Sequence, residues 1–326
     1  MPKSETIASL GENEALARSL GQLIKADSAL LGPGDDAAQV SAPAGNLLVS
    51  TDTMIEGHDF RLDWSSGFDL GWKAVATNFA DIAAMGGRPS ALVIALAVRP
   101  DTELVWLQQF VEGLNAACLQ LSPGAGVVGG DLALSETATI AVTVLGDPSG
   151  ALITRGGAMP GDVIAVAGTL GRAASGLAIL SAANPELAQA YDEFVISQLR
   201  PNPPISLGTA AAAAGATSML DVSDGLARDA YRIARASKVS LALFRENFDG
   251  YCAMLEAPAQ ALGVDPIDWV LSGGEDHALL ATFPAAATLP RGFKPIGEVI
   301  AGQSEVLLDG QPKTEAGWDS LRSQQN

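Results

Sequence analysis

The chain has 326 residues, of which 48% are hydrophobic and 17% charged, and its formal net charge is -18. This length exceeds the usual size of one hydrophobic core and favours two domains. The negative charge repels phosphate backbones and argues against nucleic-acid binding. No segment approaches the ~20 apolar residues that span a bilayer, and the N-terminus lacks a secretion pattern, so we expect a soluble cytoplasmic protein without membrane contact.

Cysteine usage supports the same compartment. Cys118 and Cys252 are the only cysteines, and neither has a second metal ligand at close spacing. A disulfide framework or a zinc site is therefore not expected, and a reducing cytosol suits the chain.

The first half of the chain alternates between helical and strand patterns. A helix is predicted over residues 12–26, and the apolar run 47–49 predicts a strand that ends at Ser50-Thr51-Asp52-Thr53. There follow a helix at about 69–85, a strand at 92–98, a helix at 102–120, a short strand with a glycine turn at 127–131, and a strand at 137–146.

The turn-rich segment 146–162 predicts a domain boundary near residue 150, which divides the chain into domains 1–150 and 151–326. The second half is also predicted to be α/β. Its expected strands lie at 162–168, 218–223, 239–244 and 277–283, with helices near 172–182, 186–199, 204–215 and 225–237.

Acidic residues recur beside glycine or other small residues, mostly at predicted strand ends and turns. The six sites are Gly34-Asp35-Asp36, Ser50-Thr51-Asp52, Asn78-Phe79-Ala80-Asp81, Gly129-Gly130-Asp131, Asp221-Val222-Ser223-Asp224 and Gly273-Gly274-Glu275-Asp276. Magnesium binds one or two carboxylates together with phosphate oxygens, and glycine lets the backbone approach a phosphate closely. An aspartate in a glycine turn is also a common turn former or helix cap. The alternative interpretation of Asp224 is a plain N-cap, and that of Asp276 is a solvated loop acid.

Two of these acids favour a functional site more strongly. Asp52 follows a predicted buried strand, where an unpaired carboxylate would be costly and would need a cation or strong donors. Asp81 lies in an otherwise apolar helix with Asn78 one turn earlier on the same face. The P-loop pattern and the H-R-D and D-F-G elements of protein kinases are absent, so any phosphate chemistry uses another fold.

Seven segments in this order resemble the thiamine-monophosphate kinase family, which belongs to the superfamily that includes aminoimidazole ribonucleotide synthetase. They are GPGDDAA, LLVSTDTMIEG, GWKAVATNFADIAAMGG, VVGGD, TRGGAMPGD, LDVSDGL and LSGGEDHALL, and the resemblance runs from about residue 30 to residue 320. It implies two α/β domains, with the N-terminal sheets of two subunits joining in a homodimer. The N-terminal domain would bind ATP and magnesium, and the C-terminal domain would complete the substrate and nucleotide site.

The resemblance also implies roles for individual residues. Those expected to bind several magnesium ions are Asp36, Ser50, Thr51, Asp52, Asp81, Asp131, Asp221 and Asp224. The expected ATP contacts are Gly130, Asp131, Arg155 and Ser223, and the expected substrate contacts are Asp59, Glu275 and Trp318. Asp59 stands where the family commonly has histidine, because this chain reads Gly57-His58-Asp59-Phe60.

Two of these residues are also plausible from their chemistry alone. Arg155 is a lone cation in a glycine-rich segment, and guanidinium binds phosphate in a bidentate manner, although a solvated linker arginine would look the same. Trp318 presents an aromatic face that suits a cationic thiazolium, or it pins the C-terminus.

The expected reaction is direct in-line transfer of the ATP γ-phosphoryl group to thiamine monophosphate, with no protein nucleophile. The acceptor phosphate is ionised near neutral pH, so positioning and charge neutralisation carry the barrier. One alternative is another enzyme of the superfamily, a cyclo-ligase or a selenophosphate synthetase, although no early cysteine precedes Gly34. A second alternative is a non-catalytic acidic metal-binding protein, but the sequence lacks the EF-hand loop pattern that such proteins often carry.

Overall fold

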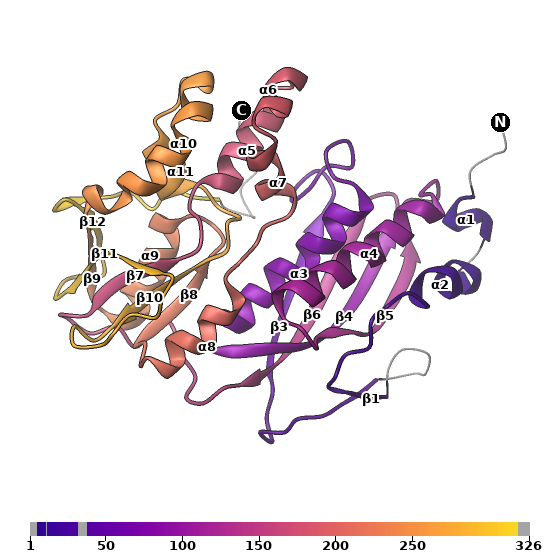
Figure 1. Cartoon of the computed structure of the whole chain (residues 1–326), viewed down its shortest axis with the longest axis horizontal. Helices are drawn as coiled ribbons and strands as arrows, with labels where there is room; N and C mark the ends of the chain where they lie inside the picture. Colours follow the sequence, from indigo (N-terminus) through magenta and orange to yellow (C-terminus); the bar gives the residue numbers. More distant parts are fainter. Residues whose placement is uncertain (1–4, 11, 32–37, 319–326) are drawn as a thin grey trace. The chain divides into compact units, whose positions relative to one another are not determined.

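The computed structural model describes residues 5–10, 12–31 and 38–318 (Figure 1). The chain divides into two compact units, one of residues up to Ile82 with Arg88–Pro148, the other of Ala83–Gly87 with the chain from Ser149 onward. None of the described helices is long and apolar enough to cross a membrane.

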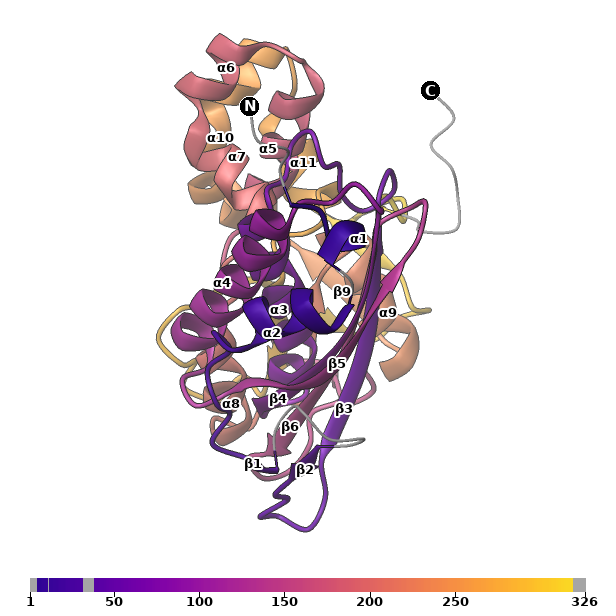
Figure 2. The ribbon, with the colours of Figure 1, turned by 90° about the vertical axis from the view of Figure 1, so that its right-hand side faces the viewer.

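The N-terminal unit is built on a four-stranded sheet of order β3-β6-β4-β5. Its strands are β3 (Leu48–Ile55), β4 (Gly87–Val98), β5 (Gly126–Leu134) and β6 (Thr139–Pro148), and a separate pair is formed by β1 (Ala29–Leu31) and β2 (Gln39–Val40). The helices are α1 (Ile7–Leu10), α2 (Glu12–Leu20), α3 (Gly67–Ala84) and α4 (Leu104–Leu121). Figures 1 and 2 show α3 and α4 along one face of the sheet.

Strand register decides which side chains face those helices. Strands β3 and β6 are antiparallel, with Ser50 opposite Val144 and Asp52 opposite Val142. Val142 and Val144 are buried, so Ser50 and Asp52 lie on the helix-covered face of the sheet. Thr51 lies opposite Thr143 on the other face, where the two hydroxyl oxygens are 3.3 Å apart.

Helices α3 and α4 pack with their backbones unusually close together, because glycine occupies the contact on both helices. A Cβ atom on Gly71 would lie 2.0 Å from the carbonyl oxygen of Phe110. A Cβ atom on Gly113 would lie 2.1 Å from the carbonyl oxygen of Phe68. Any larger residue would therefore push apart the two helices that cover the sheet.

The C-terminal unit contains a mixed seven-stranded sheet of order β13-β12-β9-β11-β7-β10-β8. Its strands are β7 (Val163–Ala167), β8 (Ser218–Val222), β9 (Ser240–Leu243), β10 (Ala278–Phe283), β11 (Phe293–Ile300), β12 (Val306–Leu308) and β13 (Gln311–Pro312). Among the described strands of this sheet, only β12 and β9 pair in parallel. The central strands are buried on both faces, as the pattern of β10 shows.

The helices of this unit are α5 (Arg172–Ser181), α6 (Pro185–Ala190), α7 (Asp192–Leu199), α8 (Ile205–Ala213), α9 (Leu226–Ser237), α10 (Asp249–Leu262) and α11 (Pro266–Ser272), with a 3-10 turn, η1 (Arg245–Phe248). Helix α5 packs against α7, α10 and α11, and these helices gather with α6 at one end of the sheet (Figures 1 and 2). One hydrophobic core, which includes Ile164, Tyr251 and Leu280, joins helices and sheet.

Several sequence predictions of element boundaries are wrong. Strand β3 extends to Ile55, so Ser50–Thr53 lie within the strand and not at its end. The glycines of VVGGD lie inside β5 and form no turn, because β5 pairs with β4 on both sides of a bulge between Val127 and Gly129 and continues to Leu134. The predicted helix 12–26 ends at Leu20, and the helix predicted over 186–199 is two helices that meet at Tyr191.

The glycine contact between α3 and α4 yields a stability prediction. Gly71→Ala and Gly113→Ala should each lower the free energy of unfolding by about 2 kcal/mol or more, since the added methyl group overlaps backbone that cannot rotate away. The matched control is Gly250→Ala in α10, where a Cβ atom meets nothing within 4 Å. That change should stabilise by about 0.5–1 kcal/mol, as alanine is the better helix former. Urea unfolding of the three variants measures both effects, and equal losses would contradict the close backbone contact.

Candidate functional site

In the N-terminal unit, one of the candidate acids, Asp81 on α3, is in contact with strand β3. Ser50 Oγ donates a hydrogen bond of 2.7 Å to Oδ2 of Asp81, in the last turn of α3. Asn78, one turn earlier, is buried and its side-chain NH2 donates to the carbonyl oxygen of Ala74. The side-chain oxygen of Asn78 is buried and accepts no hydrogen bond from a described residue. A polar helix face thus meets the strand that carries Ser50 and Asp52.

The environment of Asp52 differs from the buried one that the sequence predicts. It lies in the middle of an edge strand, its side chain is exposed, and its Oδ1 accepts a 2.8 Å hydrogen bond from the backbone N–H of Thr53. The expectation that burial forces Asp52 to hold a cation is therefore wrong, because water reaches this carboxylate. What favours a role for Asp52 is its position on the same face as Ser50.

Thr51, Gly130 and Asp131 are separated from that group. The hydroxyl of Thr51 donates to the carbonyl oxygen of Val142 at 2.8 Å, on the other face of the sheet from Ser50. Gly130 and Asp131 lie on β5, the edge strand opposite β3, and Asp131 is exposed. Three strand spacings separate β3 from β5, which is about 14 Å.

Two further predicted residues belong to this part of the chain. Asp59 is half-buried, and its Oδ2 accepts a 2.8 Å hydrogen bond from the backbone N–H of Ile55. It therefore closes the turn that follows β3. Asp36 lies outside the described residues.

In the C-terminal unit, the end of β8 and the segment 273–277 lie side by side. The backbone N–H of Glu275 donates to the carbonyl oxygen of Ser223 (2.8 Å), and that of His277 donates to Val222 (3.1 Å). Glu275 and His277 adopt positive φ angles of 67° and 51°, which non-glycine residues rarely do. The buried side chains of His277 and Asp221 meet, with Nδ1 and Oδ2 3.0 Å apart.

Asp224 is held by a network that sequence reasoning missed. Its carboxylate forms an ion pair with Arg232, which also pairs with the fully buried Asp229. Oδ2 of Asp229 accepts the backbone N–H groups of Asp224 (3.0 Å) and Gly225 (3.2 Å). Burial raises the pKa of Asp229 to about 7, and the charge of Arg232 opposes that rise. The signal was present in the sequence, since an acid in the first turn of a helix often caps the preceding loop.

Glu275 and Asp276 have different environments. The side-chain amide of Gln198 donates to the carboxylate of Glu275. Asp276 is buried, and its Oδ1 accepts the hydroxyl of Thr169 at 2.8 Å and the backbone N–H of Ala173 at 3.4 Å. Burial raises the pKa of Asp276, while these hydrogen bonds favour the anion and oppose the rise. The interpretation of Asp276 as a solvated loop acid is therefore wrong.

The remaining predicted residues are accessible. The half-buried Trp318 donates its backbone N–H to the carbonyl oxygen of Asp224 at 2.9 Å, which brings the C-terminal stretch to the β8–α9 loop. Ser223 is half-buried in that loop. Arg155 is exposed, and its guanidinium has no ion-pair partner among the residues that the structure describes.

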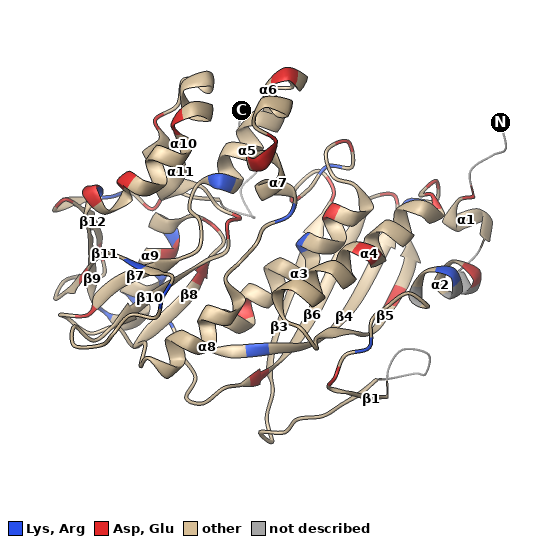
Figure 3. Cartoon of the chain, in the orientation of Figure 1, with Lys and Arg blue, Asp and Glu red and all other residues tan. Residues whose placement is uncertain are grey.

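The donor atoms of both units fit magnesium in kind. They are carboxylate, hydroxyl and amide oxygens, the ligands that hard divalent cations prefer. The unsatisfied side-chain oxygen of Asn78 is such an atom. Within the described ranges, however, no three His, Cys, Asp or Glu side chains gather closely enough to hold a metal ion. Figure 3 shows acidic positions spread over both units, so charge alone does not mark the site.

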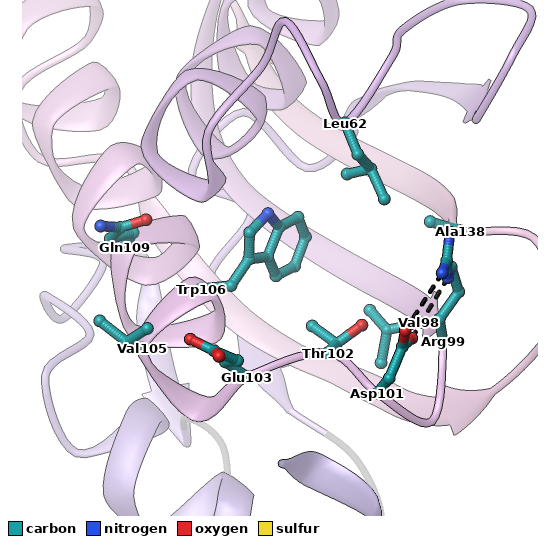
Figure 4. A pocket seen from close by; sticks show the side chains of 10 residues that line it. All are labelled: Leu62, Val98, Arg99, Asp101, Thr102, Glu103, Val105, Trp106, Gln109 and Ala138. Carbon is teal, nitrogen blue, oxygen red and sulfur yellow. Dashed lines mark hydrogen bonds and ion pairs between the residues drawn. The ribbon is translucent and has the colours of Figure 1, made fainter. Parts of the chain in front are cut away.

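A separate cavity of about 410 Å³ lies in the N-terminal unit, between the end of β4 and the start of α4. Figure 4 shows Trp106 at its centre and Arg99 paired with Asp101 at one side, with N–O distances of 3.2 and 3.1 Å. The predicted metal, ATP and substrate residues do not line this cavity.

The N-terminal part of the chain matches a known protein family. Residues 34–147 match the family model described as AIR synthase related protein, N-terminal domain. The fold is accordingly α/β, with an N-terminal sheet domain of the AIR synthase type and a C-terminal domain built on a mixed sheet.

Similar sequences and solved structures point to one family within this class. The chain is 42% identical to the thiamine-monophosphate kinase of Mycobacterium tuberculosis (strain ATCC 25618 / H37Rv), over 99% of this chain and 96% of that one. It is similar to the solved structure of AaThiL complexed with AMPPCP and TMP, with a TM-score of 0.77 and 32% identity over 83% of this chain and 86% of that one. It is also similar to the crystal structure of thiamine-monophosphate kinase from Stenotrophomonas maltophilia K279a, with a TM-score of 0.76 and 31% identity, over 92% of this chain and 96% of that one. The chain belongs to the thiamine-monophosphate kinase family.

The raised pKa of Asp276 yields a pH prediction. The folded protein keeps the Asp276 proton to a higher pH than the unfolded chain, in which the pKa of aspartate is about 3.9. The free energy of unfolding therefore falls as the pH rises from the unfolded pKa through the higher folded pKa. Asp276→Asn cannot ionise and should lose less stability between about pH 4 and pH 8 than the unmodified protein. Urea unfolding across this range measures the difference, with Asp268→Asn as the exposed control. Parallel pH profiles for all three proteins would contradict it.

Proposed function

We propose that this protein transfers the γ-phosphoryl group of ATP to thiamine monophosphate, giving thiamine diphosphate and ADP. The observation that carries the proposal is 42% identity along nearly the whole chain to a thiamine-monophosphate kinase. A second support is the solved relative in complex with AMPPCP, a non-hydrolysable analogue of ATP, and TMP. We also propose a cytoplasmic location, which is supported by the use of ATP and by the two free cysteines.

The chemistry asks little of the protein beyond positioning. The acceptor phosphate is already an anion near neutral pH, so no strong general base is required, and we propose direct in-line transfer without a phosphorylated residue. The exposed guanidinium of Arg155 suits bidentate binding of ATP phosphates, with Gly130 and Ser223 as further ATP contacts. Glu275, Trp318 and Asp59 are proposed to contact thiamine monophosphate.

We propose that magnesium ions are held by the acids and hydroxyls that the sequence singled out. They are Asp36, Ser50, Thr51, Asp52, Asp81, Asp131, Asp221 and Asp224. Bound there, the ions would neutralise the charge of the phosphates. The carboxylates of Asp81, Asp221 and Asp224 each already engage a protein donor, which fixes their orientation in advance.

The sheet of the N-terminal unit favours a homodimer with a shared site. Asp52 and Asp81 lie at the β3 edge, whereas Asp131 lies on β5, about 14 Å away across the sheet. Carboxylates that bind one ion must come within a few ångströms of each other. Asp131 of one copy joining the Asp52 and Asp81 of another would satisfy this condition if two N-terminal sheets pair.

The function is tested by incubating the purified protein with ATP, magnesium and thiamine monophosphate and following thiamine diphosphate by chromatography. Thiamine and aminoimidazole-type substrates serve as alternative acceptors. Asp81→Asn should lower the rate at least about 100-fold while leaving the melting temperature nearly unchanged, because it removes charge that the phosphates require. The control Asp268→Asn should behave like the unmodified protein. Absence of thiamine diphosphate with the unmodified protein would refute the proposed activity, and an active Asp81→Asn enzyme would refute the proposed role of Asp81.

The shared site is tested by coexpressing two inactive variants. A mixed dimer of Asp52→Asn and Asp131→Asn would contain one site with both changes and one unmodified site, so random pairing should restore about a quarter of normal activity. The control pair, Asp52→Asn with Asp81→Asn, should restore none, because both changes lie on the same side of the shared site. A monomeric mass by light scattering, or no restored activity, would contradict the dimer.

A further inference from the structure

His277 has a left-handed backbone conformation. It immediately precedes β10 and adopts φ of 51°, in the left-handed region where non-glycine residues are uncommon and where Asn, Asp and His are the most frequent of them. Its backbone N–H is nevertheless held by the carbonyl oxygen of Val222, at the end of β8. The two strands pair directly beyond this point, with Ala278 opposite Val222 and Leu279 opposite Asp221. The fold thus fixes His277 beside Asp221.

The side chains of His277 and Asp221 form a buried contact. Nδ1 of His277 lies 3.0 Å from Oδ2 of Asp221, and the exposed fractions of the two residues are only 6% and 7%. An ionised carboxylate can only accept a hydrogen bond, so the tautomer of His277 that pairs with the carboxylate form of Asp221 is the one with the proton on Nδ1. Oδ1 of Asp221 accepts no hydrogen bond from a described residue. One oxygen is therefore anchored, and the other remains available to a cation.

We infer that His277 is a positioning residue for Asp221: its Nδ1–H anchors Oδ2 and so presents Oδ1 to the magnesium ion that Asp221 binds. The inference rests on the proposed function, which makes Asp221 a metal ligand. Partners that orient a ligating side chain typically change metal affinity by about 10- to 100-fold when they are lost. His277 itself touches neither metal nor substrate in this arrangement.

The test uses two substitutions of nearly equal shape. His277→Asn places an amide N–H close to the position of Nδ1 and tolerates positive φ, whereas His277→Leu has no donor. Binding of Mn²⁺, used in place of magnesium with AMPPCP and without turnover, is followed by electron paramagnetic resonance. The Leu variant should bind Mn²⁺ about 10-fold more weakly at the affected site, and the Asn variant should bind like the unmodified protein.

Two further measurements separate positioning from a purely structural role. In the Asp221→Asn background, His277→Leu should cause no additional loss of Mn²⁺ affinity, since its effect passes through Asp221. Excess magnesium should also restore much of the turnover of the Leu variant. If the Leu variant does not fold, His277→Gln replaces it, because its amide reaches the position of Nε2 and not that of Nδ1. It should then bind Mn²⁺ as weakly as expected for Leu.

Failure of this inference can be told apart from failure of the proposed function. If the unmodified protein neither binds Mn²⁺ nor makes thiamine diphosphate, the proposed function fails. If it does both, and the Leu or Gln variant binds Mn²⁺ as tightly as the unmodified protein, only the role of His277 is overturned. That role is likewise overturned if the Asn variant binds Mn²⁺ as weakly as the Leu variant.

Discussion

The constraint on which the rest depends is electrostatic: a chain with a formal charge of -18 must keep its candidate site carboxylates in place against their mutual repulsion. Like charges repel at short range, and buried carboxylates are costly without partners. The structure meets this by giving each of three candidate acids a different donor: the Ser50 hydroxyl for Asp81, the His277 imidazole for Asp221, and the Arg232 guanidinium for Asp224. The orientation of each of these carboxylates is thereby fixed by a protein donor.

Neutral and charged donors have different consequences. The hydroxyl of Ser50, and the imidazole of His277 in its neutral form, fix a carboxylate while leaving its negative charge available, which suits a metal ligand. Arg232 neutralises Asp224 and at the same time holds Asp229, whose other oxygen caps the backbone of the Asp224 loop. A cation that binds Asp224 must therefore share its carboxylate with an arginine.

Close backbone packing provides the frame in the N-terminal unit. Glycines at 71 and 113 let α3 and α4 approach until backbone meets backbone. Asp81 lies in the last turn of the same α3, and Ser50 reaches it from the sheet. Glycines that the sequence shows only as helix interruptions are therefore tied to the placement of a candidate ligand.

The sequence by itself determined the family, the α/β class and the segments that carry the acids, because these depend on local residue patterns in a fixed order. It also placed Asn78 and Asp81 on one helix, as helical periodicity requires. Only the tertiary structure decided that β3 continues through Ser50–Thr53, that Asp52 is exposed, and that Asp131 lies on the opposite edge of the sheet. Strand register and order are set by pairing between distant segments, which no local pattern encodes. The partners of Asp221 and Asp224 were hidden for the same reason, since His277 is 56 residues from Asp221 and meets it only across β8 and β10.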